Sequence, residues 1–406
     1  MRSHHAGVFY VQEPSASVPA GLLGVRPGGR VLDLCAAPGG KTSQLAAALR
    51  GEGLLVANEY VAARAGVLKS NLERMGVTNA LVLNESTARV AAAFPAFFDK
   101  VLVDAPCSGE GMFRKEPEAL RQHSAALVAQ CAALGASILD DAAAALRPGG
   151  LLCYSTCTFA PEEDEAQVGA FLARHPEFTV LPAPTNAGAP GEAARCGAHP
   201  FAAEHTRRIY PCHGGEGHFM ALLQKRGDGA PPEAEQARPR AARGQRGAKR
   251  GRDMRACRPA QGGNGVSRAE ARAEGEAFLC EYFPGAAQLP LECRGTELFV
   301  LSREGCGPTE GLRVVQAGVC AGSAARGRFV PAHHLFMAYG AQCVNAERLT
   351  LADPRTAAWL RGEAIPAETA APGWAAVLAD GFPLGFGKQS GGVVKNHYPK
   401  GLRNLK

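Results

Sequence analysis

The sequence of 406 residues lacks the marks of several protein classes. No apolar run approaches the roughly 20 residues that a membrane-spanning helix needs. The first ten residues lack the apolar stretch of a secretory signal peptide. The sequence therefore predicts neither a membrane protein nor a secreted one.

Paired cysteine motifs are absent as well. No CxxC pair occurs, and the 13 cysteines are an odd number spread along the chain. A disulfide framework fits this pattern poorly and a reducing cytoplasm fits it well, so we expect a cytoplasmic protein. Cys196, Cys212 and His213 match no zinc-binding spacing, and we expect no metal site.

Large apolar residues are scarce between residues 226 and 275, where Ala, Gly, Arg and Pro dominate. Such a segment buries too little surface to offset the entropy of ordering, which predicts a disordered linker. Between Arg238 and Arg258 it carries nine Lys or Arg residues and one acid, whereas the whole chain has a net charge of +6. We expect this segment either to bind nucleic-acid phosphates without sequence preference or to act as a solubilising spacer.

Hydrophobic residues make up 46% of the chain and charged residues 20%, enough for sizeable cores in two or three domains. Before the linker, apolar runs alternate with helical patterns, which predicts an α/β fold with a parallel sheet. The expected strands are 31–34, 54–57, 80–83, 101–103, 151–154 and a late edge strand at 219–223, and the expected helices include 42–49, 62–75 and 117–146. After the linker we expect a small β-rich module, with strands at 298–301, 312–317, 382–387 and 391–395 and a helix at 350–360.

A loop of small residues at 35–41 follows the first expected strand. Small residues let a backbone approach a ligand, and the following helix N-terminus offers free N–H groups. A nucleotide P-loop is excluded because it needs Gly where Cys35 stands, and a GxGxxG loop is excluded because its glycines do not recur. A nucleoside cofactor without a diphosphate remains, and Glu59 after the second strand is placed to accept hydrogen bonds from its ribose. A solvated surface glutamate is the alternative for Glu59.

Two further segments deliver a cysteine just past the end of a strand, Cys107 after the fourth strand and Cys157 after the fifth. Open α/β sheets bind their ligands at this edge. A single such cysteine is more often structural than catalytic. Two of them at neighbouring strand ends, one close to Asp104, favour a catalytic pair.

With these motifs the sequence resembles the RNA 5-methylcytosine methyltransferase family, the RsmF/NSUN group. The strings that carry the resemblance are Asp33-Leu-Cys-Ala-Ala-Pro-Gly-Gly-Lys-Thr42, Asp104-Ala-Pro-Cys-Ser-Gly-Glu-Gly111 and Ser155-Thr-Cys-Thr158, supported by Tyr10-Val-Gln-Glu-Pro-Ser15, Phe113-Arg-Lys-Glu-Pro117 and Arg208-Ile-Tyr-Pro211. The end of the chain is similar to the PUA-like RNA-binding domain of bacterial RsmF-type members, in Gly381-Phe-Pro-Leu-Gly385 and Lys395-Asn-His-Tyr-Pro-Lys-Gly401.

The resemblance implies a Rossmann-like sheet that binds S-adenosylmethionine in residues 1–225. The basic linker at 226–275, an intermediate RsmF-type region at 276–348 and the PUA-like domain at 349–406 would follow. Family members usually carry a further domain before the Gln-Glu-Pro-Ser segment, which about a dozen residues precede here.

The resemblance also implies which residues bind S-adenosylmethionine. Glu59 would bind the ribose, and Asp104 would lie near the methionine part and the base. After the third strand, either Glu85 or Ser86 would contact the adenine. The loop residues that would bind the cofactor are Cys35, Ala36, Ala37, Pro38, Gly39, Gly40 and Lys41.

The implied reaction needs a thiolate, because C5 of cytosine becomes nucleophilic only after a nucleophile adds to C6. By resemblance Cys157 is the nucleophile, Cys107 assists release and Asp104 orients the base. The residues alone do not rank the two cysteines, since DNA cytosine methylation uses a Pro-Cys cysteine like Cys107. For Lys115 the alternatives are a contact with the RNA backbone, a contact near Asp104, or an ordinary exposed lysine.

The expected function is therefore methylation of cytosine C5 in RNA, with ribosomal RNA favoured over transfer RNA as the partner. The expected protein is a monomer without a membrane partner. DNA cytosine methylation is an alternative that the Thr-Cys-Thr motif around Cys157 and the RNA-binding tail disfavour. A catalytically silent RNA-binding factor of ribosome assembly is another, which the intact cofactor loop and both cysteines disfavour.

Overall fold

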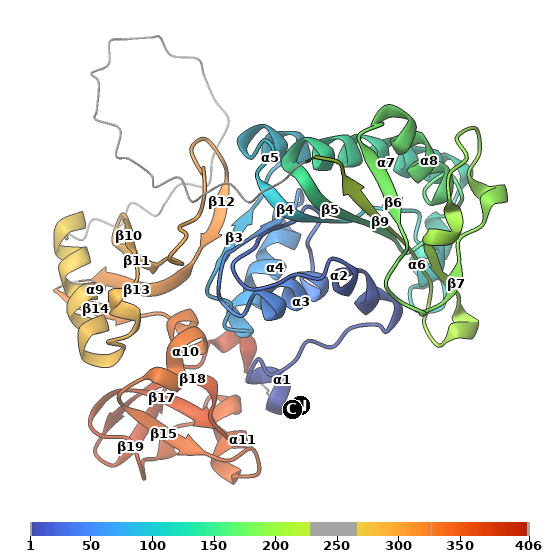
Figure 1. The fold of residues 1–406 in the computed structure, drawn as a ribbon. Coiled ribbons are helices and arrows are strands. Elements are labelled where there is room, and N and C mark those ends of the chain that lie inside the picture. The colour runs from blue at the N-terminus through green and yellow to red at the C-terminus, as the bar shows by residue number, and fades with distance from the viewer. Residues whose placement is uncertain (1, 228–265, 326, 404–406) are drawn as a thin grey trace, which may run out of the picture.

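The structure is a computed structural model that describes residues 2–227, 266–325 and 327–403 (Figure 1). A large mixed sheet occupies the N-terminal part, and two smaller sheets follow after residue 266. The basic segment between Arg238 and Arg258 lies outside the described residues, so its expected roles stay predictions.

The large sheet has ten strands in the order β12-β3-β2-β1-β4-β5-β9-β8-β7, with β6 paired to β9. Strands β3, β2, β1, β4 and β5 are parallel, and β9 runs antiparallel to β5. The parallel part confirms the predicted α/β sheet. The strands are β1 (Arg30–Asp33), β2 (Leu54–Asn58), β3 (Ala80–Leu83), β4 (Phe98–Asp104), β5 (Leu146–Thr156), β6 (Phe178–Leu181), β7 (Ala189–Pro190), β8 (Arg207–Ile209), β9 (His218–Lys225) and β12 (Val314–Ala317).

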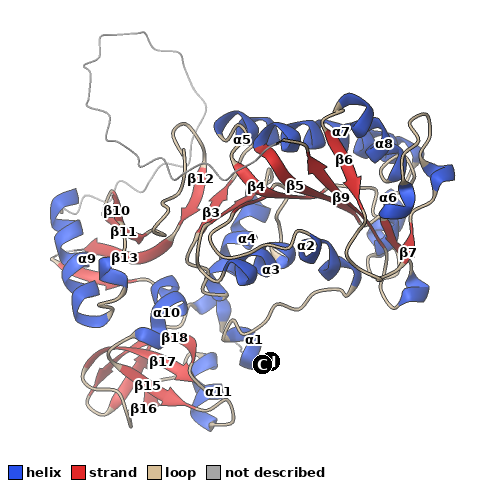
Figure 2. Cartoon of the chain, viewed as in Figure 1, coloured by secondary structure: helices blue, strands red, loops and turns tan. Residues whose placement is uncertain are grey.

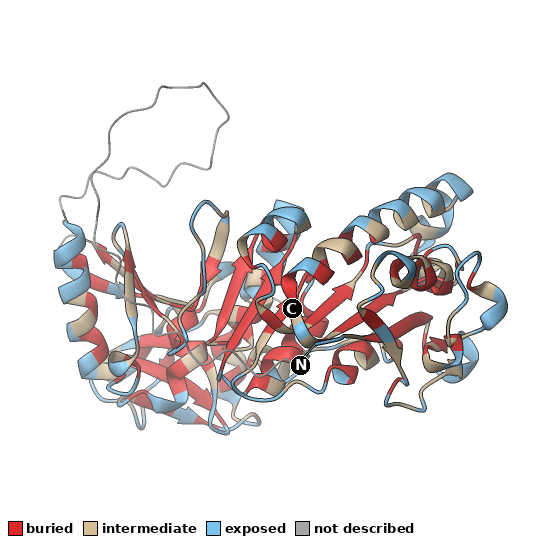
Figure 3. Cartoon of the chain, turned by 45° about the horizontal axis from the view of Figure 1, so that its top comes forward, coloured by how far each residue is buried: buried red, intermediate tan, exposed pale blue. Residues whose placement is uncertain are grey.

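Helices cover both faces of this sheet (Figure 2). Helices α5, α7 and α8 pack on one face, and α2, α3 and α4 pack on the other. The central strands are therefore buried on both sides (Figure 3), which explains why they read as continuous apolar runs. The helices are α1 (Arg2–His5), α2 (Val18–Leu22), α3 (Gly40–Leu49), α4 (Ala62–Arg74), α5 (Thr87–Ala93), α6 (Pro117–Gln122), α7 (Ala125–Ala145) and α8 (Glu165–Arg174).

The structure corrects three predictions about the elements. Strand β9 is not the sheet edge, because β8 and β7 lie beyond it. The helix predicted at 117–146 is two helices, α6 and α7, because the Ser124 side chain caps a new N-terminus for α7. The predicted linker ends before residue 275, because helix α9 begins at Arg268 with Ser267 as its N-cap.

Helix α7 also qualifies the prediction that no apolar segment is long enough for a membrane span. Among the described residues it is the one helix that length and composition alone would allow to cross a membrane. Its residues Ile138, Leu139, Ala142 and Ala143 are buried in the core between α7 and the sheet. These contacts account for the apolar residues on the face of α7 that packs against the sheet.

The C-terminal part confirms the predicted β-rich region. Its sheets have the orders β10-β11-β13-β14 and β15-β17-β18-β19-β16, and one core runs through both, with Phe336 stacked on Phe386 at 4.4 Å between ring centroids. The elements are α9 (Arg268–Tyr282), β10 (Leu291–Arg294), β11 (Glu297–Val300), β13 (Val319–Ala325), β14 (Arg328–Pro331), α10 (His333–Tyr339), β15 (Ala346–Leu349), α11 (Pro354–Arg361), β16 (Ile365–Pro366), β17 (Gly373–Ala379), β18 (Phe382–Ser390) and β19 (Val393–Asn396).

The two parts of the chain are in contact at several places, among them an edge strand of the large sheet and the two ends of the described chain. Strand β12 leaves the C-terminal part and pairs with β3 at the edge of the large sheet (Figure 1). The ends of the described chain also meet, with His5 Nδ1 and Tyr398 Oη 3.1 Å apart. The C-terminal part is thus held to the N-terminal part by a strand at the edge of the large sheet and by a contact between the chain ends.

Candidate active site

The loop between β1 and α3 lies at the carboxyl edge of the parallel strands. Gly39 adopts a φ of 109° at the N-cap of α3, a conformation that favours glycine. Ala36 N donates to Asn58 O at 2.8 Å, and the Arg64 guanidinium donates to Ala37 O at 2.8 Å. These bonds fix the loop directly before a helix N-terminus, whose first N–H groups can bind an anionic group.

Two buried carboxylates beside this loop can accept further hydrogen bonds. Asp33 Oδ2 accepts from Thr42 Oγ1 at 2.7 Å, and Asp33 Oδ1 has no hydrogen-bond partner among the described residues. Glu59 is 4% exposed, and its Oε1 accepts from Val61 N at 2.8 Å while Arg64 lies 3.6 Å from Oε2. Buried acceptors call for donors, and ribose hydroxyls supply them, so the loop fits the expected S-adenosylmethionine.

Asp33 makes the stability of the fold depend on pH. Burial raises the pKa of Asp33 to about 7. The pKa of an aspartate in an unfolded chain is about 3.9. Between about pH 4 and 7 the folded state therefore binds a proton on Asp33 that the unfolded state does not, and the fold loses stability as the pH rises through that range. We expect Asp33→Asn to lack this loss. The free energy of unfolding of the wild type should therefore fall by roughly 1–4 kcal/mol relative to that of the variant as the pH rises across this range. Urea unfolding of both proteins at several pH values measures this, and a constant difference between them would contradict it.

Asp104, at the end of β4, is the centre of a polar cluster at the same edge. Lys41 Nζ lies 2.7 Å from its Oδ2, Ser155 Oγ donates to its Oδ1 at 2.7 Å, and His218 Nε2 lies 3.6 Å from Oδ1. Burial alone would raise the pKa of Asp104, but the Lys41 ammonium and His218 outweigh it and hold the pKa well below its usual range. Asp104 is therefore an ionised acceptor at neutral pH.

His218 was not predicted from the sequence. It begins β9 and is buried, and burial together with the Lys41 charge lowers its pKa. Its imidazole is therefore neutral beside Asp104 at neutral pH. The signal in the sequence was a histidine at the start of an otherwise apolar strand, and the strand prediction left that residue out.

The two cysteines lie together, as their strand-end positions suggested. Cys107 Sγ and Cys157 Sγ are 3.2 Å apart. Their loops follow the paired strands β4 and β5 and are joined by a hydrogen bond from Gly111 N to Cys157 O at 2.9 Å. The side chains of Ser108 and Thr158 add a hydrogen bond of 2.8 Å between the same loops. The structure thus brings both sulfurs to one point beside the Asp104 cluster.

The two thiols differ in their hydrogen bonds. The hydrogen bond with Cys157, together with burial, raises the pKa of Cys107 well above its usual value. Cys107 therefore keeps its proton and can donate it toward the sulfur of Cys157. Cys157 N in turn donates to Cys107 Sγ at 3.3 Å, which fixes the geometry of the pair.

A buried ion-pair network holds the segment around Cys157. The Arg208 side chain is fully buried, with its Nη1 3.0 Å from Asp164 Oδ2 and its Nε donating to Glu165 Oε1 at 2.7 Å. Thr156 Oγ1, one residue before Cys157, donates to Asp164 Oδ1 at 2.6 Å. The position of the cysteine thus depends on an arginine from β8.

Two of the predicted site residues are paired with other charged side chains. Lys115 is half-exposed, and its Nζ is 3.8 Å from Glu216 Oε1. Glu85 is buried, and its carboxylate already accepts from Arg313 N at 2.7 Å and pairs with Arg89 Nε at 2.8 Å. The adenine contact proposed for Glu85 would have to share these acceptors.

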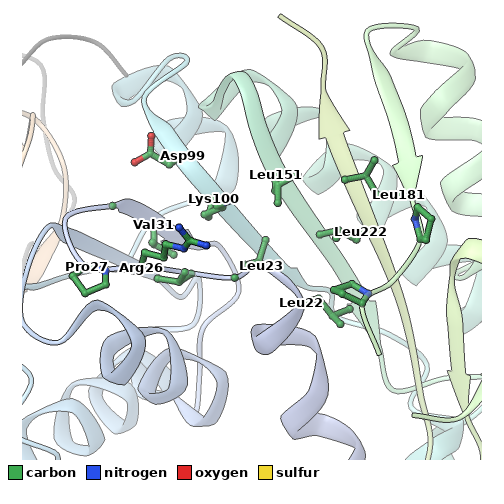
Figure 4. Close-up of a pocket in the computed structure, with 15 residues that line it drawn as sticks. Leu22, Leu23, Arg26, Pro27, Val31, Asp99, Lys100, Leu151, Leu181 and Leu222 are labelled. Atoms are coloured by element: carbon green, nitrogen blue, oxygen red, sulfur yellow. The ribbon is translucent and has the colours of Figure 1, made fainter. Parts of the chain in front are cut away.

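A cavity of about 640 Å³ lies elsewhere on the sheet (Figure 4). Its lining includes Val31, near the start of β1, and Lys100, near the start of β4, together with Leu23, Leu181 and Leu222. The cysteines follow the opposite ends of β4 and β5. The cavity is therefore separate from the cysteine pair.

Comparison with known families matches three parts of the chain. Residues 20–224 match the family described as 16S rRNA methyltransferase RsmB/F. Residues 277–339 match the first C-terminal domain of the RsmF rRNA methyltransferase, and residues 346–404 match the PUA domain of methyltransferase RsmF.

Individual proteins are similar over different lengths. The ribosomal RNA small subunit methyltransferase F of Erwinia tasmaniensis is 33% identical over 98% of this chain and 79% of its own length. Its counterpart from Cronobacter sakazakii is 41% identical over 55% of this chain, a match that spans about half, 46%, of that protein. The crystal structure of PH0851 has a TM-score of 0.51 and 33% identity, over 55% of this chain and 48% of that one.

Proposed function

Because the chain belongs to the RsmB/F family of 16S rRNA methyltransferases, we propose that it methylates C5 of a cytosine in small-subunit ribosomal RNA. The methyltransferases of this family depend on S-adenosylmethionine. The observation that carries the proposal is the 3.2 Å pair of Cys107 and Cys157 beside the ionised Asp104. Cytosine C5 needs activation by a thiolate at C6, and a thiol pair beside a base-binding carboxylate fits that need. A ribosomal substrate is consistent with the expected cytoplasmic location.

Residues at the carboxyl edge would hold the cofactor, which supplies an electrophilic methyl group on a sulfonium. The start of α3, after Gly39, would bind the methionine carboxylate through free N–H groups. Glu59 would accept hydrogen bonds from the ribose. The remaining loop residues from Cys35 to Lys41 would line the site without large side chains, apart from Lys41, whose ammonium is engaged by Asp104.

In the first part of the reaction, the Cys157 thiolate adds to C6 of the cytosine and the electron pair of the C5–C6 bond moves to C5 and the ring. C5 would then form a bond to the methyl group, whose bond to the sulfonium breaks, so that the cofactor would leave as the neutral thioether S-adenosylhomocysteine. Asp104, ionised through Lys41, can accept a hydrogen bond from the 4-amino group and so orient the ring. An ionised carboxylate has no proton for N3, so the amino group is the better partner. Ser155 and Lys41 hold Asp104 in place.

In the second part, C5 carries both the new methyl group and its proton. The proton passes to solvent, the C5–C6 double bond re-forms, and the C6–S bond breaks with its electron pair going to Cys157 Sγ. The protonated Cys107, 3.2 Å away, can donate a hydrogen bond to this leaving thiolate. Release should therefore depend on Cys107, and addition should not.

Transfer of a radioactive methyl group from S-adenosylmethionine to purified 16S rRNA or small subunits tests the proposal. Asp104→Asn keeps an acceptor for Ser155 but loses the charge that pairs with Lys41 and orients the base. We expect its rate to fall by about 10²-fold at saturating cofactor, the size typical of a lost acid–base or orienting group. The exposed Glu304→Gln serves as the control and should keep wild-type activity.

Label in DNA, or in no nucleic acid, would contradict the proposal and favour the DNA-enzyme or the silent assembly-factor alternative. The target nucleotide can be identified by bisulfite sequencing of RNA from a strain that lacks this gene. We expect one methylcytosine to disappear from 16S rRNA. Its disappearance from transfer RNA would move the substrate to that class.

A further inference from the structure

The edge of the large sheet is completed by a strand from the C-terminal part of the chain. In the pairing of β12 with β3, Val314 lies opposite Leu83. One residue earlier, Arg313 O accepts from Asn84 N at 3.0 Å, and Arg313 N donates to Glu85 Oε1 at 2.7 Å. The main chain of Arg313 thus holds both residues that follow β3.

Those two residues are bonded in turn to the residues that end β2. Asn84 Nδ2 donates to the carbonyl oxygens of Glu59 and Tyr60, each at 2.8 Å. Glu85 N donates to Asn58 Oδ1, and Asn58 Nδ2 donates to Glu85 O, both at 3.1 Å. The ribose-binding Glu59 is therefore positioned by the loop that Arg313 holds.

Asn58 extends the network to the loop after β1. Its Nδ2 also donates to Leu34 O at 3.2 Å, and its carbonyl accepts from Ala36 N at 2.8 Å. Asn58, Asn84 and Glu85 are all buried. A buried polar network of this kind holds its members rigidly when every group is bonded and is disturbed when one donor is lost.

The Glu85 carboxylate is the point where the network depends on the C-terminal part. It is 1% exposed, and its partners are the Arg313 N–H and the Arg89 guanidinium, which also donates to Gly311 O. A buried carboxylate that loses a donor must move or take up a proton. Either response would shift Asn58, because the Asn58 side chain is bonded to the main chain of Glu85.

We propose that Arg313 is a positioning residue for the cofactor site. Its main chain holds Asn84 and Glu85 and thereby sets the loops after β1 and β2 that receive the nucleoside. Glu85 then acts through this network and not by contact with adenine. The inference rests on the proposed use of S-adenosylmethionine and makes the C-terminal part a component of the cofactor site.

Arg313→Pro in the full chain removes the N–H and leaves the carbonyl. Val314 N donates to Leu312 O at 3.1 Å, which makes Arg313 the central residue of a three-residue turn. The φ of Arg313 is negative, so the turn is an inverse γ-turn, whose central residue has a φ near −75°. Proline adopts nearly this φ, so the turn is kept. We expect the Kd for S-adenosylhomocysteine, measured by calorimetry, to rise about tenfold, because the lost donor bonds a charged group. The KM for S-adenosylmethionine should rise likewise, with kcat at saturation changed less than about twofold.

Arg313→Ala is the matched control, because it keeps the N–H and removes only an exposed side chain whose Nη2 is 3.6 Å from Glu85. Its Kd should stay within about twofold of wild type. An unchanged Kd in Arg313→Pro, or an equal rise in both variants, would overturn the inference. Failure of the wild type itself to bind S-adenosylhomocysteine would instead overturn the proposed function.

Glu85→Ala gives a second test should the proline variant fail to fold. The probes are S-adenosylhomocysteine and S-inosylhomocysteine, whose base lacks the amino group. A positioning role predicts that the variant loses affinity for both by the same factor. A loss confined to the adenine form would mean that Glu85 contacts the base, and the positioning role would be wrong.

Discussion

Replacing Cys157 with alanine should abolish methyl transfer to RNA while the protein still binds S-adenosylmethionine. The thiolate that must add to C6 is then missing, so no covalent adduct can form. Cys107→Ala should behave differently, because addition and methyl transfer need only Cys157. Its reaction should stall before release, and the protein should accumulate as a covalent complex with RNA, visible as a slow band on a denaturing gel.

Both substitutions remove only a sulfur from a small side chain, so both variants should fold. The exposed Cys280→Ala is the control and should turn over without a trapped complex. A complex trapped by Cys157→Ala and absent from Cys107→Ala would reverse the two roles. The mechanism would then be of the type used by DNA cytosine methyltransferases.

Arg208→Met should destabilise the large-sheet part of the protein by about 3–5 kcal/mol. Asp164 and Glu165 are fully buried, and the variant leaves both carboxylates without their counter-ion. Burial already raises the pKa of Asp164 well above its usual value, so the penalty comes mainly from the Glu165 carboxylate left buried without a counter-ion, more than from the lost attraction. The midpoint of urea unfolding measures this. Activity should fall as well, because Thr156 and Asp164 hold the segment that carries Cys157.

Arg272→Met is the matched control, since Arg272 and Glu276 form an exposed pair one helical turn apart at 2.7 Å. An exposed pair of this kind contributes at most about 1 kcal/mol, so the midpoint should hardly move. An equally small change in Arg208→Met would mean that the buried network is dispensable for stability.

The strands of the parallel sheet were predictable because burial on both faces makes each one a short apolar run. The run at 80–83 is observed unchanged as β3, and the other central strands differ only at their ends. The break between α6 and α7 was less visible, because a single cap at Ser124 decides it within a continuous helical pattern. Local patterns thus determined which segments form elements, and less well where these begin and end.

Strand partners were predictable only where the connections are short. The run at 312–317 reads as a strand, yet nothing in it indicates that β12 pairs with β3, more than two hundred residues earlier. The position of β9 inside the sheet depends likewise on β8 and β7, whose short runs carry no clear pattern. Pairing between distant strands is set by the packing of the whole molecule.

The sequence by itself determined the residue types of the candidate site: a loop of small residues, Glu59, Asp104 and two cysteines, each after a strand. Only the tertiary structure decided their geometry. It placed the sulfurs of Cys107 and Cys157 3.2 Å apart, directed Lys41 and His218 to Asp104, and buried Arg208 next to Asp164, which bonds to the segment that carries Cys157. The physical reason is that strand order in a parallel sheet brings the carboxyl ends of distant segments to one edge, where desolvation and neighbouring charges set the ionisation of each group.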